Sequence, residues 1–127
     1  MVVMLEEAKE LLETAALMVE KGEKYEAVNM VEMAVNKAVA ELERAAGQEN
    51  FGEPLQRRLA KFTDNIEIIN YAKVIEDIFD PTIYPVGFDA GTEEPSVSFG
   101  QALIAVEYGR RIVDFAESKI NELTGGV

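Results

Sequence analysis

The sequence predicts an all-α fold, a helical up-and-down bundle of four to five helices with a long Pro/Gly loop before the last helix. Two observations predict it. Apolar residues recur at steps of three and four over most of the 127-residue chain, and glycine or proline follows each such stretch. Because a chain of this length is ordinarily one domain, residues 1–127 are interpreted as a single helical domain.

The first half of the chain predicts two long helices. One runs from Met4 to Lys21 and ends at Gly22, and the other runs from about Lys24 to Ala46 and ends at Gly47. Each carries one broad apolar face. The faces comprise Met4, Ala8, Leu11, Ala15 and Val19, with Leu12 beside them, in the first helix, and Val28, Val31, Val35, Ala38 and Leu42 in the second. Since the link is only a few residues, the two helices are expected to form an antiparallel hairpin.

The next segment predicts two shorter helices. Pro54 suits the first turn of a helix, because the N–H that proline lacks has no partner there in any case. This short helix carries Leu55, Leu59 and Phe62. Residues 63–65 then predict a stop and a new N-cap, with Asp64 and Glu67 in capping-box spacing. The helix that follows cannot pass Pro81.

Residues 80–97 hold three prolines and two glycines, and they predict an extended loop that is unusually long for a compact domain. Its Tyr84-Pro85 pair is interpreted as a loop anchor, with the ring covering the core edge. Whether the loop orders on binding is left open. Ser98 and Gln101 have capping-box spacing and predict the start of the last helix. Its inner stripe comprises Ala102, Val106, Gly109, Val113, Ala116, Ile120 and Leu123.

Composition excludes several classes of function. The net charge of −12 repels phosphate backbones, so no DNA partner is expected and any polyanion must find a local basic patch. The absence of cysteine excludes disulfides, thiolate nucleophiles and Cys-ligated zinc. No basic N-terminal region and no apolar run of membrane-spanning length occurs, so the sequence predicts no membrane association and a cytoplasmic location.

Three features together resemble a known family. The second helix contains Glu32-Met33-Ala34-Val35-Asn36-Lys37-Ala38-Val39-Ala40, the loop carries Tyr84-Pro85, and the last helix contains Ile112-Val113-Asp114-Phe115. This order of elements resembles the HEPN domain over about residues 4–123. The resemblance implies two long antiparallel helices, shorter ones, a loop with a Tyr-Pro pair and a closing helix. It also implies a homodimer, and a partnership with a small nucleotidyltransferase in a toxin–antitoxin-type pair.

The sequence contains no histidine, which separates it from the nuclease branch of that family. HEPN ribonucleases resemble one another in an arginine followed four to six residues later by histidine, and their chemistry needs a group that exchanges protons near neutral pH. Two further departures point the same way. Ile83 stands where members often have arginine, and Glu53-Pro54-Leu55 stands where they often have His-Asp-Leu. The prediction is therefore that the protein is not an enzyme of this type.

Other catalytic patterns are weak. Glu76 and Asp80 lie four residues apart on one helical face, with Asp77 beside them, but such a pair makes at most a weak magnesium-type site. No His/Cys set for zinc or iron occurs, and neither Gly-rich phosphate-binding pattern is present. No metal and no cofactor is predicted.

Two positive features remain. Arg57, Arg58 and Lys61 cluster on the short third helix, and Arg110-Arg111 forms a second pair on the last. If these five converge, they form an anion or nucleotide site; the alternative is surface cations that pair with the abundant carboxylates. Met30 and Met33 are expected on the far side of the second helix from its core stripe, where they predict a dimer or partner surface.

Three functions compete at this stage. The leading hypothesis is a non-catalytic, HEPN-like dimeric protein that acts through protein–protein interaction. The second is a protein that binds a nucleotide or short RNA at the basic residues. The third is a residual ribonuclease that uses carboxylate or tyrosine chemistry in place of histidine.

Overall fold

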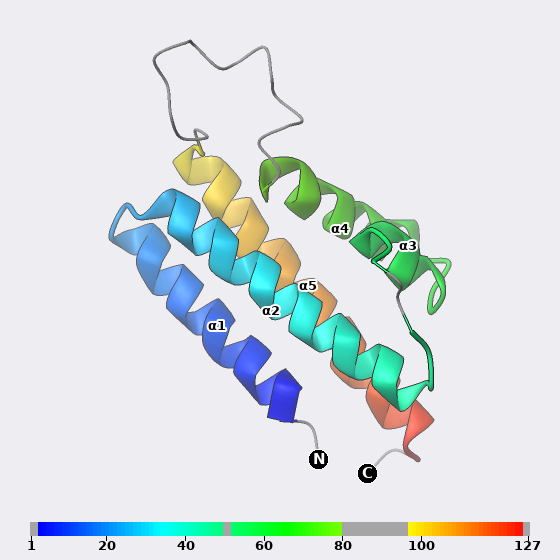
Figure 1. Cartoon of the computed structure of the whole chain (residues 1–127). Helices are drawn as coiled ribbons and strands as arrows, with labels where there is room; N and C mark the ends of the chain where they lie inside the picture. Colours follow the sequence, from blue (N-terminus) through cyan, green and yellow to red (C-terminus); the bar gives the residue numbers. More distant parts are fainter. Residues whose placement is uncertain (1–2, 50–51, 80–96, 126–127) are drawn as a thin grey trace.

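The computed structural model describes residues 3–49, 52–79 and 97–125. These residues form five helices and no strand, which confirms the predicted all-α fold. The helices are α1 (Val3–Glu20), α2 (Lys24–Ala45), α3 (Leu55–Ala60), α4 (Ile66–Phe79) and α5 (Phe99–Leu123). Figure 1 shows α2 and α5 as the central pair, with α1 packed on one side and α4 on the other. The predicted loop, including Tyr84 and Pro85, falls on residues 80–96, outside the described residues.

Glycine ends both long helices, as the sequence predicts. Gly22 has φ 82° and Gly47 has φ 69°, a backbone conformation that side-chain-bearing residues rarely adopt. After α1, the Glu23 N–H donates to the Met18 carbonyl at 2.9 Å, and after α2, the Gln48 N–H donates to the Glu43 carbonyl at 2.9 Å. These bonds satisfy carbonyls that the helix end leaves free and reverse the chain within a few residues.

The caps of the two later helices differ in how well the sequence predicts them. The capping box of α5 is confirmed, since the Gln101 N–H donates to Ser98 Oγ at 3.0 Å and the Ser98 N–H donates to Gln101 Oε1 at 2.9 Å. For α4 the prediction of Asp64 as the cap is wrong. The helix begins one residue later, and Asn65 Oδ1 accepts from the Glu67 N–H at 2.9 Å. Similarly, Pro54 precedes α3 as its cap residue.

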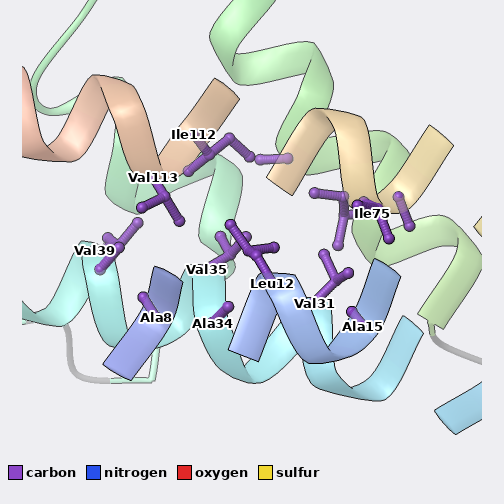
Figure 2. Packing of buried hydrophobic residues seen from close by; sticks show 14 of the residues in the cluster. Ala8, Leu12, Ala15, Val31, Ala34, Val35, Val39, Ile75, Ile112 and Val113 are labelled. Carbon is purple, nitrogen blue, oxygen red and sulfur yellow. The ribbon is translucent and has the colours of Figure 1, made fainter. Parts of the chain in front are cut away.

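The core lies along α2 and is closed by the other helices. Small and β-branched residues dominate it, which lets the helix axes approach closely. Figure 2 shows Ala8, Leu12 and Ala15 meeting Val31, Val35 and Val39, with Ile112, Val113 and Ile75 completing the layer. Gly109 marks the tightest approach, because a Cβ there would lie 2.8 Å from Val31 Cγ1 and 3.1 Å from Leu12 Cδ2.

The ends of the bundle are less buried than the stripes predict. Leu123, expected as the last inner residue of α5, is 48% exposed, since the buried face of this helix ends at Ile120. None of the helices formed by the described residues is long and apolar enough to cross a membrane.

Candidate functional site

Arg58, one of the predicted anion-binding residues, is buried in an ion pair. It lies three residues after Leu55 and one before Leu59, on the face of α3 that packs inward, and it is only 6% exposed. Its Nε donates to Glu43 Oε2 at 3.0 Å and its Nη2 donates to Glu43 Oε1 at 2.7 Å. This two-point geometry matches the planar guanidinium to the carboxylate. The expectation that Arg58 belongs to an exposed anion site is therefore corrected, because its charge is already balanced inside the protein.

The same arginine begins a polar network that joins α2, α3 and α4. Arg58 Nη1 donates to Asn36 Oδ1 at 2.8 Å, and Asn36 Nδ2 donates to the Glu32 carboxylate and to the Glu32 carbonyl. Burial raises the pKa of the Glu32 carboxyl, the hydrogen bond from Asn36 opposes that rise, and the negative charge of Glu76 adds to it.

Glu76 completes the network from α4. Its carboxylate accepts from the Leu55 N–H at 3.0 Å and from Gln56 Nε2 at 3.3 Å. The short helix α3 is thus capped at its start by a side chain from a different helix, in place of a cap from its own preceding residue. The network holds α3 in place, and it presents no free positive charge.

The other predicted basic residues do not converge. Lys61 forms an ion pair with Glu53, and Arg111 pairs with Glu107 at 3.0 Å. Arg111 faces α4, where its Cζ lies 6.0 Å from the centre of the Tyr71 ring, whereas Arg110 faces α1. Arg57 is exposed on α3, and neither Arg57 nor Arg110 makes an ion pair with another residue of the described ranges. The five cations therefore form no single site.

An aromatic contact between α4 and α5 was not predicted from the sequence. The rings of Tyr71 and Tyr108 have centroids 4.4 Å apart at an interplanar angle of 34°. The Tyr71 hydroxyl also lies 3.5 Å from Glu67 Oε2. Both rings are half-buried and pack against the core, so this contact fixes α4 on α5.

The two methionines proposed as a dimer surface differ in environment. Met33 is 42% exposed, as expected, and lies beside Leu11 and Lys37 in a shallow hollow between α1 and α2. Met30 is half-buried and packs against the core, so its expected place on the solvent face is wrong. Of the two methionines, only Met33 is available to a partner.

A groove between α1 and α5 was missed by the sequence reasoning. Two hollows, of about 370 and 230 Å³, follow one another along these helices and share Arg110 as a lining residue. We call this the α1–α5 groove. Its apolar floor comprises Leu12, Ala16, Val19, Leu103, Val106 and Val113. At its wider end, Leu103 is 48% exposed and Phe99 is 53% exposed, so two large apolar side chains of α5 stand in solvent there.

Metal binding has no support among the residues that the structure describes. No group of three or more His, Cys, Asp or Glu side chains in those ranges could hold a metal ion. The candidate functional features are therefore the exposed apolar surfaces on either side of α1 and the buried polar network behind α3.

The bundle, with α2 and α5 between α1 and α4, defines an all-helical class of protein, and comparison with known proteins identifies the family. The HEPN domain model matches residues 1–119, so the chain belongs to the HEPN domain family. No curated protein has a matching sequence.

Two solved structures are similar to this chain. TT1696 from Thermus thermophilus is 26% identical, with 91% of this chain and 94% of that chain covered at a TM-score of 0.75. ST0689, described as an archaeal HEPN homologue, is 20% identical, with 92% and 94% covered at a TM-score of 0.76. The second likeness concerns the fold alone, and it agrees with the family assignment.

Proposed function

We propose that this HEPN protein acts by binding other protein chains and does not cleave RNA. The observation that carries the proposal is a group of large apolar side chains left in solvent on α1, α2 and the first turns of α5, namely Leu17, Met33, Phe99, Leu103 and Ile104. Single exposed apolar residues are ordinary, but several on adjoining helices of a small protein are typical of an interaction surface.

The chemistry of the chain supports a non-enzymatic role. Cleavage at a ribose hydroxyl needs a group that both accepts and donates protons near neutral pH, and the sequence has no histidine to supply it. The third-helix arginine Arg58 is held by Glu43, so it is not free to stabilise a phosphate.

The proposed assembly has two parts. The protein forms a homodimer through the Met33 side of the bundle, and it pairs with a small nucleotidyltransferase in a toxin–antitoxin-type arrangement, as its family membership implies. The net charge of −12 suits a partner with a basic face, and it equally suits solubility.

Sedimentation of the purified protein tests the homodimer. The wild type is expected to sediment at twice the 14.0-kDa mass of the chain, and Met33→Glu at the mass of one chain, because a charge placed in an apolar interface must be desolvated. Leu123→Glu is the matched control, since Leu123 is similarly exposed but lies at the end of α5. A Met33→Glu variant with the mass of the wild type would show that this face is not the interface.

A further inference from the structure

The α1–α5 groove has the length of a short helix. On α1 its lining runs from Lys9 to Glu20, and at 1.5 Å per residue this corresponds to roughly 16 Å, or about three helical turns. The N-terminal half of α5 provides most of the opposite wall, and it lies at the same end of the bundle as the C-terminal half of α1 (Figure 1). A groove of this length with apolar residues along its floor suits an amphipathic helix laid along it.

The protein leaves large apolar side chains uncovered at one end of the groove. Val19, Val106 and Val113 are buried at the bottom, whereas Leu103 and Phe99 stand exposed at one end. If an apolar side chain of a partner packed against Leu103, that side chain and Leu103 would both be removed from water. The exposed end therefore provides the anchor of a binding surface, and the buried valines provide its base.

The walls of the groove carry more negative than positive charge. Glu13 and Glu20 lie on the α1 wall, and Asp114 lies on the α5 wall together with Glu107, which is paired with Arg111. The lining cations are Lys9 and Arg110. Lys9 already forms an ion pair with Glu117 at 2.7 Å, and this hydrogen bond raises the pKa of Lys9.

Beyond the groove, the exposed face of α1 adds Glu6. A cationic segment would be attracted to the surplus of carboxylates along this face.

We infer that the α1–α5 groove binds an amphipathic helix of a basic partner protein, with the apolar face of that helix on the floor and its Lys or Arg residues against the acidic walls. The inference rests on the proposed function, because it names the chemistry of the protein partner. The occupant is a peptide segment, and the homodimer surface around Met33 lies on the other side of α1.

A designed peptide tests this assignment. The probe is a fluorescein-labelled amphipathic peptide of Leu and Lys, about 14 residues long so that it spans the groove. Its binding is measured by fluorescence anisotropy at about 0.15 M salt, because salt at this concentration screens non-specific electrostatic attraction. Two further peptides serve as comparisons. One has the same composition in a scrambled order, and the other has Glu in place of Lys.

Two protein variants locate the binding. Leu103→Asp is expected to weaken binding of the Leu/Lys peptide about tenfold or more, and Ile66→Asp about twofold at most. Both variants add one negative charge at an exposed apolar residue, since Ile66 is 79% exposed on α4. They therefore change the net charge of the protein equally, and only the first removes the apolar anchor; an added carboxylate at position 103 would by itself strengthen the attraction of a cationic peptide. Circular dichroism of both variants verifies that the helices are retained.

Each outcome bears on the inference. The inference is supported if the ordered Leu/Lys peptide binds tightly, the scrambled peptide binds more weakly, and Leu103→Asp abolishes binding of the ordered peptide. Equal binding of the ordered and scrambled peptides, preference for the Glu peptide, or equal effects of the two variants would overturn it. If Leu103→Asp converts a homodimer to monomers while the Leu/Lys peptide does not bind, the occupant is a second copy and the inference is wrong. The effect of Met33→Glu on mass is independent, so failure of the groove leaves the proposed homodimer standing.

Discussion

Replacing Arg58 with alanine should destabilise the protein by about 3–5 kcal/mol, the cost of removing one partner of a buried ion pair. Glu43, whose side chain is 4% exposed, would keep its charge in the interior without the two hydrogen bonds that Arg58 provides. Because the free energy of unfolding of native domains is about 5–15 kcal/mol, this loss is a large fraction of the protein's stability. Urea unfolding followed by circular dichroism measures it.

The control for this prediction is the neighbouring arginine. Arg57 is exposed and makes no ion pair within the described residues, so Arg57→Ala should change the free energy of unfolding by about 0.5 kcal/mol or less. The double variant Arg58→Met with Glu43→Leu should lose much less than Arg58→Ala, because it removes both charges together. Equal stability of Arg58→Ala and Arg57→Ala would contradict the role of the buried pair.

Replacing Gly109 with valine should cost about 3 kcal/mol, at the upper end of overpacking effects. Even the first carbon of a side chain at this position would lie 2.8 Å from Val31 Cγ1, so α5 would have to move away from α2 and α1. The two further methyl groups of valine enlarge the displacement. The midpoint of thermal unfolding is expected to fall accordingly.

Gly100 provides the comparison on the same helix. A Cβ there would meet only Ser98 Oγ at 3.9 Å, so Gly100→Val should leave the thermal midpoint close to that of the wild type. If Gly109→Val were as stable as Gly100→Val, the three long helices could not be as closely packed as the structure shows.

The helices were predictable because their determinants are local. The three-and-four spacing of apolar residues, the glycines after α1 and α2, and the Ser98–Gln101 capping box each depend on residues close in the sequence. The one wrong cap, Asp64 in place of Asn65, arises where two adjacent residues can both cap a helix. In that case only the backbone conformation decides where the helix begins.

The basic cluster was mispredicted for geometric reasons. Arg110 and Arg111 are consecutive on a helix, so their side chains point about 100° apart, and here one faces α1 and the other α4. Arg58 shares a face with Leu55 and Leu59, a spacing that indicates burial. Its partner Glu43, however, lies on another helix, and local patterns cannot pair them.

The α1–α5 groove was beyond sequence reasoning altogether. Leu103 falls outside the predicted inner stripe of α5, and Leu12 lies beside the predicted apolar face of α1. The relative placement of α1 and α5, which are far apart in the sequence, decides whether such residues pack together or leave a groove between them.

An RNA-cleavage assay tests the central proposal, that this HEPN protein works without nuclease activity, most directly. Purified protein is incubated with single-stranded RNA, with Mg²⁺ and separately with EDTA. The proposal predicts no cleavage above that of the buffer in either condition, because the sequence has no histidine to transfer protons and Arg58 is bound to Glu43. Cleavage that increases with protein concentration and is lost in Arg57→Ala or Glu76→Gln would contradict it.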